Sequence, residues 1–425
     1  MKKLRMCISL LLLLALLTLA FASAQEQDTL PGGLSGSLIG GGIMTIRPPE
    51  VIKLSDTQTE RLEELMADYE YKEDSLLINP AEHFYYYEHI SPLARQIYDV
   101  IYDIARDPVE GNVGLLLTDL DPFNDTGFWT AYNAAYWALE WDRPELFWLH
   151  SGEAYIVPGY SYLINGTYYI YFYVEETFTA FEEQMRAFNA AADSFASQID
   201  TTRGDYETVL QIHDRLCELV TYNTPSCSRG NDLSHTAYGA FVEDSIGVDN
   251  YPVCDGYSLA FEYICQRFGI EALVVPGFGG SDAYNGGGHA WNMVKLNGTW
   301  YEMDVTWDDN ILDNMAEDFR TIEGWHANRE MNDYTYECYV EAFTDSAYRD
   351  KLGHAYFLLS TDSISKFDAG DRFVYPAKGG REQLKYGPTS DVHIRDCDMY
   401  DADPDQNPNV TLSALLPIAP RDYAN

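Results

Sequence analysis

An Asn-Gly dipeptide at 297–298 lies at the centre of the segment 289–306, between two runs with strand-like alternation. Asn-Gly in this setting is the strongest short signal for a two-residue β-hairpin turn. The turn sets the register and predicts paired strands up to residue 306, with Trp291 opposite Asp304. Because side chains alternate along a strand, His289, Trp291 and Asp304 share one face. Diagonal neighbours such as His289 and Asp304 lie roughly 7–8 Å apart, which their side chains can close.

The segment before this hairpin predicts a helix that begins near a cysteine. After Cys254, apolar residues recur at the spacing of one helix face, and Gly269 follows where a C-cap glycine ends a helix. Unpaired N–H groups and the dipole in the first turn lower the pKa of a thiol and can hold an oxyanion. Cys265, on the apolar stripe itself, fits the commoner case of a buried, inert thiol. The pattern therefore favours Cys254 as a nucleophile.

Cys254, His289 and Asp304 together supply the residue types of a thiol relay. A carboxylate fixes the tautomer of a histidine and stabilises its imidazolium, and the histidine accepts the thiol proton. Taken singly, a buried cysteine or a cross-strand His–Asp pair is more often structural. Because two independent patterns converge on the three residues, we predict a catalytic triad.

Three blocks around these residues resemble those of the transglutaminase-like superfamily. They are Val253-Cys254-Asp255-Gly256-Tyr257-Ser258-Leu259-Ala260-Phe261, Gly288-His289-Ala290-Trp291-Asn292 and Trp300-Tyr301-Glu302-Met303-Asp304-Val305-Thr306-Trp307-Asp308. The resemblance covers about 205–365 and is closest in kind to bacterial secreted members. It implies an α+β fold with a papain-like core, in which a nucleophile helix packs on an antiparallel sheet. The segment 356–360 resembles the closing strand of that sheet.

One part of the animal transglutaminase pattern is missing. Those enzymes use a Trp upstream of the Cys as an oxyanion donor, and no Trp lies between Trp148 and Cys254. Tyr238 is a candidate substitute, and Trp291 is a second candidate for an oxyanion or substrate contact. The absence puts protein crosslinking in doubt more than thiol-dependent hydrolysis.

The N-terminus predicts an exported protein. A basic start and an apolar run at 8–21 precede Ala22-Ser23-Ala24, so we expect a signal peptide at 1–24, cleaved after Ala24, and a secreted chain without a membrane span. The formal net charge of -40 argues against nucleic acid and anionic membranes as partners. No Cys or His spacing suggests zinc, so we expect no metal and no cofactor, with His213 and His235 structural.

Composition shifts divide the rest of the chain. We predict a Gly/Pro-rich flexible leader at 25–54, an accessory α/β region at 55–200, a catalytic domain at 201–365 and a C-terminal extension at 366–425. Further expectations are helices at 92–106, 128–141, 178–199, 206–219 and within 321–353, a strand at 145–150, a hairpin about Asn165-Gly166, and a glycine-rich lid or spacer at 277–288.

The function that fits these features is acyl transfer on a peptide or amide bond. Hydrolysis by a secreted cysteine peptidase or amidase is favoured over crosslinking, because water is the default acceptor and no amine site is visible. The expected partner is a protein or peptide, such as a cell-wall or surface polypeptide. The alternative is a non-catalytic extracellular module that binds protein or glycan on the same fold, for which a poised thiol would have no use.

Overall fold

The computed structural model describes the greater part of the chain from residue 84 onward and three short pieces before it. The described residues are 35–37, 43–45, 50–51, 84–106, 113–122, 125–150, 156–164, 166–174, 181–226, 232–282, 285–344, 346, 350, 353–365, 374–376, 383–385, 392–395 and 416–423. The predicted signal peptide and most of the predicted leader lie outside them. Among the described residues, no helix is long and apolar enough to cross a membrane.

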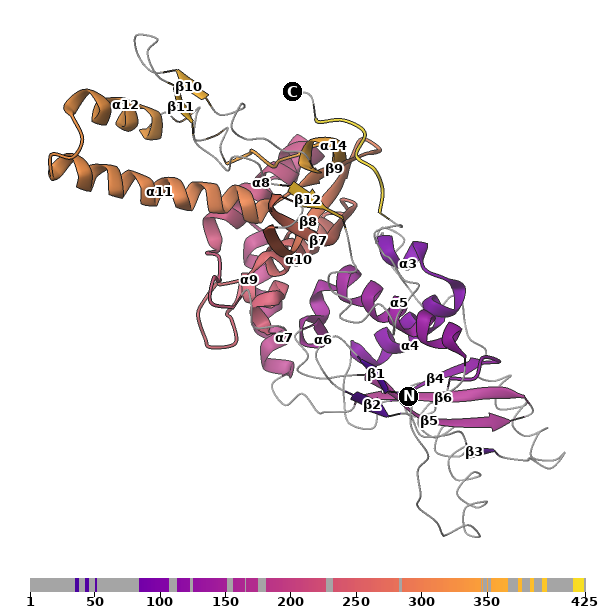
Figure 1. Ribbon diagram of the computed structural model, residues 1–425. Coiled ribbons are helices and arrows are strands. Elements are labelled where there is room, and N and C mark those ends of the chain that lie inside the picture. The colour runs from indigo at the N-terminus through magenta and orange to yellow at the C-terminus, as the bar shows by residue number, and fades with distance from the viewer. Residues whose placement is uncertain are drawn as a thin grey trace.

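The first part of the molecule combines a four-stranded sheet with the helices α3, α4 and α5 (Figure 1). Its four-stranded sheet has the order β3-β5-β6-β4, and β5 and β6 form the predicted hairpin about Gly166, whose φ is +92°. The elements are β3 (Glu50–Val51), β4 (Val113–Thr118), β5 (Ile156–Ile164), β6 (Thr167–Val174), α3 (Tyr85–His89), α4 (Pro92–Ala105) and α5 (Thr126–Asp142). Ser91 caps α4, since its Oγ accepts from the N–H of Ala94 at 3.2 Å.

The second part holds the candidate catalytic residues. Its sheet has the order β12-β7-β8-β9, all neighbours antiparallel, and α10 packs on β7 and β8. The strands are β7 (Ala272–Asp282), β8 (Asn285–Leu296), β9 (Thr299–Met303) and β12 (Val392–Ile394). The helices are α7 (Phe181–Ala196), α8 (Asp205–Leu219), α9 (Ala237–Phe241), α10 (Cys254–Arg267), α11 (Val305–Ala327), α12 (Asp333–Thr344) and α14 (Thr361–Ser365). This arrangement is the predicted α+β class.

Short elements complete the described structure. They are β1 (Ser35–Ser37), β2 (Ile43–Thr45), β10 (Val374–Pro376), β11 (Gln383–Lys385), α6 (Phe147–His150) and the 3₁₀ turns η1 (Pro144–Leu146), η2 (Thr201–Arg203) and η3 (Leu233–His235). β1 pairs with β2 and β10 with β11. In Figure 1, α11 extends away from the sheet and α12 lies beside its far end.

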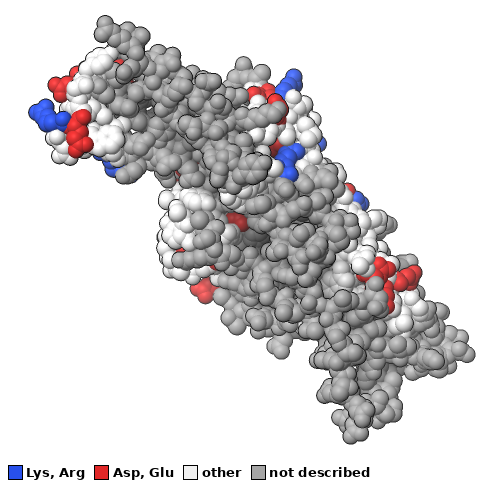
Figure 2. Space-filling model, viewed as in Figure 1, with Lys and Arg blue, Asp and Glu red and all other residues white. Residues whose placement is uncertain are grey.

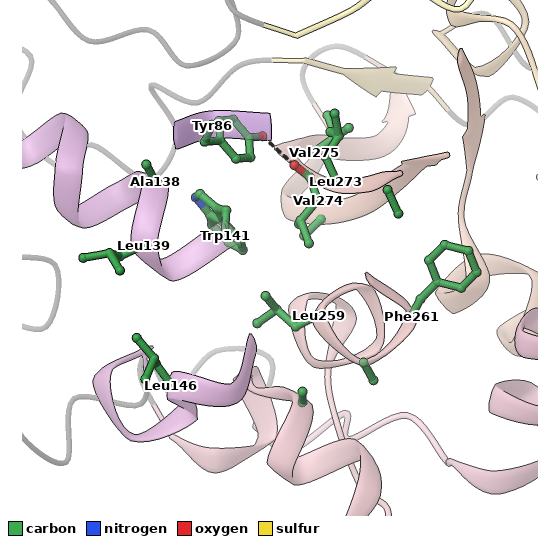
Figure 3. Packing of buried hydrophobic residues seen from close by; sticks show 14 of the residues in the cluster. Tyr86, Ala138, Leu139, Trp141, Leu146, Leu259, Phe261, Leu273, Val274 and Val275 are labelled. Carbon is green, nitrogen blue, oxygen red and sulfur yellow. Dashed lines mark hydrogen bonds between the residues drawn. The ribbon is translucent and has the colours of Figure 1, made fainter. Parts of the chain in front are cut away.

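One apolar core runs through both parts. Figure 3 shows Trp141 of α5 close to Leu259 of α10 and to the β7 valines. The hydroxyl of Tyr86 donates to the carbonyl of Val274, so α3 is tied to the catalytic sheet. Large side chains buried at such a junction stabilise it by roughly 1.5–3 kcal/mol each. The predicted accessory region therefore packs against α10 and against β7, the strand on which α10 lies.

The predicted hairpin register is confirmed from Leu296↔Thr299 to Asn292↔Met303. The second strand, however, ends at Met303, and the prediction that it continues to 306 was wrong. Asp304 caps a helix instead, because its Oδ1 accepts from the N–H of Trp307 at 3.1 Å and ends the ladder. α11 therefore begins within the predicted strand, well before the expected helical segment 321–353.

Three other local predictions were wrong. The expected strand at 145–150 is helical in η1 and α6, since Pro144 suits a first helical position. The glycine-rich stretch 277–288 is mainly paired strand, because β7 and β8 continue their ladder through it, rather than a lid. The expected closing strand at 356–360 contributes a single bridge, Glu302↔Leu359, and is otherwise turn, bend or irregular backbone.

Candidate functional site

Cys254 is the first residue of α10, preceded by an extended Val253. Gly269, at φ +71°, ends the helix as the sequence predicts. Cys254 retains 8% exposure, whereas Cys265 on the same helix is fully enclosed and burial raises the pKa of its thiol well above the ordinary value. Within the described residues, Cys217, Cys254 and Cys265 are free thiols. The structure thus separates a helix-terminal thiol that retains slight exposure from a fully enclosed core thiol.

The start of α10 is fixed by close backbone packing. The N–H of Val253 donates to the carbonyl of Ser234 at 2.9 Å. A Cβ on Gly256 would lie 2.5 Å from that carbonyl oxygen and 2.8 Å from Pro252 Cβ, so only glycine fits without a shift. This contact holds the segment before α9 against the first turn of the nucleophile helix.

His289 lies on β8 and connects the thiol with a carboxylate. Its Nε2–H donates to Asp304 Oδ2 at 2.7 Å, and its side chain also hydrogen-bonds to Cys254, which leaves Nδ1 as the nitrogen that faces the thiol. Burial lowers the pKa of His289, but the Asp304 carboxylate and Cys254 outweigh burial and raise the pKa to about 10. The ring is therefore poised to hold a proton beside the Cys254 sulfur.

Asp304 is fully buried and accepts from several donors. Burial raises the pKa of its carboxyl, yet His289 and His393 together hold the pKa well below its ordinary value. The carboxylate is thus ionised in the protein interior, where it stabilises an imidazolium.

Aromatic rings enclose the His289–Asp304 pair. Trp307 stacks on His289 with ring centroids 5.1 Å apart, and Trp291 stacks on it at 5.9 Å. Trp291 shares the face of His289 as predicted, but it is fully buried and its indole N–H donates to Glu302 at 2.7 Å. In this structure Trp291 supports His289, and its donor is already in use.

A second imidazole, His393 of β12, contacts the same carboxylate oxygen. Its Nε2–H donates to Asp304 Oδ2 at 2.7 Å, and Trp307 lies 4.2 Å away between ring centroids. Burial holds the pKa of His393 below its ordinary value, so the ring is neutral near pH 7. Among the described residues, its Nδ1 has no hydrogen-bond partner. The C-terminal segment, expected as an extension, thus contributes to the site.

His235 lies closer to the nucleophile than its expected structural role suggested. Its Nδ1–H donates to Asp255 Oδ2 at 2.7 Å. Burial lowers the pKa of His235, but Asp255 and Cys254 raise it to about 9, which places its charge within range of the thiol. Its Nε2 is buried and has no hydrogen-bond partner within the described part of the chain. Tyr238, by contrast, packs its ring on Phe147 with centroids 4.7 Å apart.

Two groups of three side chains bring possible metal-ligand atoms within 4.8 Å of one another in the described structure: His289, Asp304 and His393, and His213, Asp214 and His354. In the first group, Nε2 of each histidine donates to Asp304, and His289 faces Cys254 with its other nitrogen. That arrangement can move a proton between thiol, imidazole and a reacting group. Sequence reasoning missed His393 because its only local signal is one histidine between Val392 and Ile394.

The model of the transglutaminase-like superfamily matches residues 193–305. The matched segment contains Cys254, His289 and Asp304 and ends at the first residue of α11. His393 lies outside it.

Two curated relatives are kyphoscoliosis peptidases. The chain is 36% identical to that of Homo sapiens over 73 residues, which is 16% of this chain and 11% of the relative. It is 27% identical to that of Mus musculus over 128 residues, 28% of this chain and 18% of the relative. The similarity thus spans less than a fifth of the length of each relative.

Two solved structures are also similar. One is a candidate cysteine protease from Cytophaga hutchinsonii, with 17% identity and a TM-score of 0.22 over 33% of this chain and 52% of that one. The other is a TGase, with 15% identity and a TM-score of 0.23 over 46% and 51%. Scores this low define no common fold for the whole chain.

Proposed function

We propose, from the match of residues 193–305 to the transglutaminase-like superfamily, that the chain is a cysteine acyl-transfer enzyme acting on peptide or amide bonds. The observation that carries the proposal is the chain of contacts from Cys254 through His289 to Asp304, built at a helix N-terminus. A protein that only binds would gain nothing from an ionised buried carboxylate behind a thiol–imidazole pair.

The chemistry follows from the proton positions. The Cys254 thiol gives its proton to His289 Nδ1, and the thiolate sulfur attacks the carbonyl carbon of the substrate. The tetrahedral intermediate collapses when His289 returns this proton to the leaving amine, and a thioester to Cys254 remains. Water, deprotonated by His289, then releases the acid and restores the thiol, or an amine takes the place of water. Asp304 keeps Nδ1 aimed at the sulfur throughout.

The oxyanion needs donors near Cys254. The backbone N–H of Cys254 is one, because the first-turn amides of a helix lack intrahelical partners. We assign the second to His235, whose Nδ1 is held by Asp255 and whose charged ring leaves Nε2–H available. This assignment replaces Tyr238, whose ring belongs to an aromatic cluster with Phe147 and Phe188.

The substrate class we propose is a protein or peptide outside the cell. The N-terminal signal pattern supports export, and a net charge of -40 favours neutral or basic polypeptides over acidic ones. On the face seen in Figure 2, the described acidic and basic side chains lie side by side near the end formed by α11 and α12. Sequencing the N-terminus of the secreted chain tests export, and a start other than Gln25 contradicts the expected cleavage.

A mixed peptide library tests the activity, with and without an added amine. We expect cleavage by wild type that disappears in Cys254→Ala, and little amine incorporation. Cys265→Ala is the matched control, because it removes a thiol from the same helix and should keep activity. Iodoacetamide should alkylate Cys254 well before Cys265, whose pKa is raised by burial. A folded wild type without turnover and with an unreactive Cys254 would support the binding module instead.

A further inference from the structure

A second histidine–carboxylate cluster lies outside the candidate catalytic residues. His213 and Asp214 are consecutive residues of α8, and His354 lies in the turn at 353–360, 140 residues further on. Asp214 Oδ1 is 2.9 Å from His213 Nδ1 and 2.7 Å from His354 Nε2. The two rings face one another with centroids 5.1 Å apart. Two ring nitrogens from two segments of the chain thus meet one carboxylate oxygen, and the three possible ligand atoms lie within 4.8 Å of one another.

The other nitrogen of each ring also faces an oxygen. His213 Nε2 is 3.1 Å from Asp308 Oδ2, and His354 Nδ1 is 2.6 Å from the carbonyl oxygen of Asp350. A backbone carbonyl only accepts hydrogen bonds, and so does an ionised carboxylate. These outer contacts fix which nitrogen of each ring carries the proton and aim the remaining nitrogen at Asp214.

The count of protons does not match the count of acceptors. All four ring nitrogens face oxygens, whereas two neutral imidazoles supply only two N–H groups. Filling the contacts with protons requires two imidazolium rings side by side, one of them on the fully buried His213. A divalent cation bound by these three atoms removes the mismatch, because it replaces the two inner hydrogen bonds and leaves both rings neutral, each donating its outer N–H.

We propose that His213 Nδ1, Asp214 Oδ1 and His354 Nε2 bind one divalent transition-metal ion, and that this ion is zinc. Two imidazoles and one carboxylate are a donor set that zinc prefers. The Asp308 carboxylate behind His213 and the Asp350 carbonyl behind His354 are the outer partners that orient histidine ligands in zinc sites. The Asp214 side chain is 45% exposed, which gives the ion a path from solvent and room for a water ligand.

The position of this site indicates that the ion would stabilise the contact between α8, the turn at 353–360 and α11. Asp308 lies one turn after Asp304 on α11, and the N–H of Tyr356 donates to Asp308 Oδ1 at 2.9 Å. The N–H of Asp304 in turn donates to the carbonyl of Tyr356 at 3.1 Å. An ion held by α8 and His354 therefore ties α8 and the turn at 353–360 to the first turn of α11.

Metal content of the untagged, full mature chain, purified without chelator, tests the site. We expect one zinc per chain by mass spectrometry, and a melting temperature that falls by about 5 °C after zinc is removed. Asp214→Asn and His354→Gln should each weaken zinc binding at least tenfold. His354 is partly exposed, so its replacement should leave the fold intact. Cobalt in place of zinc should give visible bands without a thiolate charge-transfer band.

The matched control is His326→Gln, which removes an exposed histidine that pairs with Asp333 at 3.0 Å. It should leave zinc content unchanged, as should Cys254→Ala. Zinc lost in Cys254→Ala, or a thiolate band with cobalt, would place the ion at the thiol and overturn the proposal. Absence of zinc together with an unchanged melting temperature in added zinc would overturn it as well and leave an imidazolium network. None of these readouts depends on peptide turnover.

Discussion

Two aspartates in this molecule each receive two histidines on one carboxylate oxygen. Asp304 Oδ2 lies 2.7 Å from His289 and 2.7 Å from His393, and Asp214 Oδ1 lies 2.9 Å from His213 and 2.7 Å from His354. The inner contacts are almost the same. Their outer contacts differ.

Behind Asp304, the far nitrogens can be satisfied without extra charge. His289 faces a thiol, which gives or takes a proton, and the far nitrogen of His393 has no acceptor within the described residues. Behind Asp214, both far nitrogens face oxygens that only accept. A shared carboxylate alone therefore does not define a site. The groups behind the rings decide whether protons or a cation complete it.

Removal of the Asp304 carboxylate should have the largest effect on catalysis. Asp304→Ala should lower kcat/KM by about 10³- to 10⁴-fold, because His289 loses the group that orients it and stabilises its charge. Asp304→Asn should recover little of this loss, because its single carbonyl oxygen can accept from an imidazole or from the N–H of Trp307, but not from both. Steady-state kinetics on a peptide substrate measure both.

The control is Asp333→Ala, which removes the carboxylate of the exposed His326–Asp333 pair. It should leave kcat/KM unchanged. Near wild-type turnover in Asp304→Ala would mean that Asp304 is a structural carboxylate, and the contrast between the two clusters would be lost.

The proximity of Cys254, His289 and Asp304 could be predicted because its signals are local. An Asn-Gly turn fixed the register of β8 and β9, and a stripe of apolar residues after Cys254 fixed the nucleophile helix. The change from strand to helix at Asp304 could not be foreseen, because the same aspartate suits a strand end and an N-cap.

The second histidine of each cluster could not be predicted from the sequence for a different reason. His393 lies 89 residues from Asp304, and His354 lies 140 residues from Asp214. Neither segment has a helix-like or strand-like residue pattern that would indicate its partner. Only tertiary packing brings the two rings to the carboxylates. For the same reason, the proposed metal site could not be predicted from local patterns.

A glycine beside His289 allows a test of whether catalysis depends on the exact position of the imidazole, and the expected effect is smaller. A Cβ on Gly279 would lie 2.9 Å from His289 Cδ2 and 2.9 Å from Trp307 Cζ2, so Gly279→Ala should displace the imidazole. We expect kcat to fall about 100-fold, the effect of a displacement near 1 Å at a reacting group. The melting temperature should change little.

Gly287 is the matched control because it pairs with Gly279 across the β7–β8 ladder. A Cβ there meets no atom within 4 Å. Gly287→Ala should keep wild-type kcat, and equal losses in both variants would point to the strands rather than to His289.

His393 should have the smallest effect, about tenfold on kcat, because it acts on His289 only through Asp304. In His393→Phe the carboxylate is no longer shared, so its charge acts on His289 alone and raises the pKa of His289 further above about 10. Since His289 must carry a proton to release the amine, activity falls as the pH rises through this pKa. The alkaline limb of kcat/KM should therefore move to higher pH in His393→Phe and return toward wild type in His393→Gln, which keeps an N–H donor. A loss of activity with an unmoved limb would reduce His393 to a packing residue and leave Asp304 with one functional histidine, unlike Asp214.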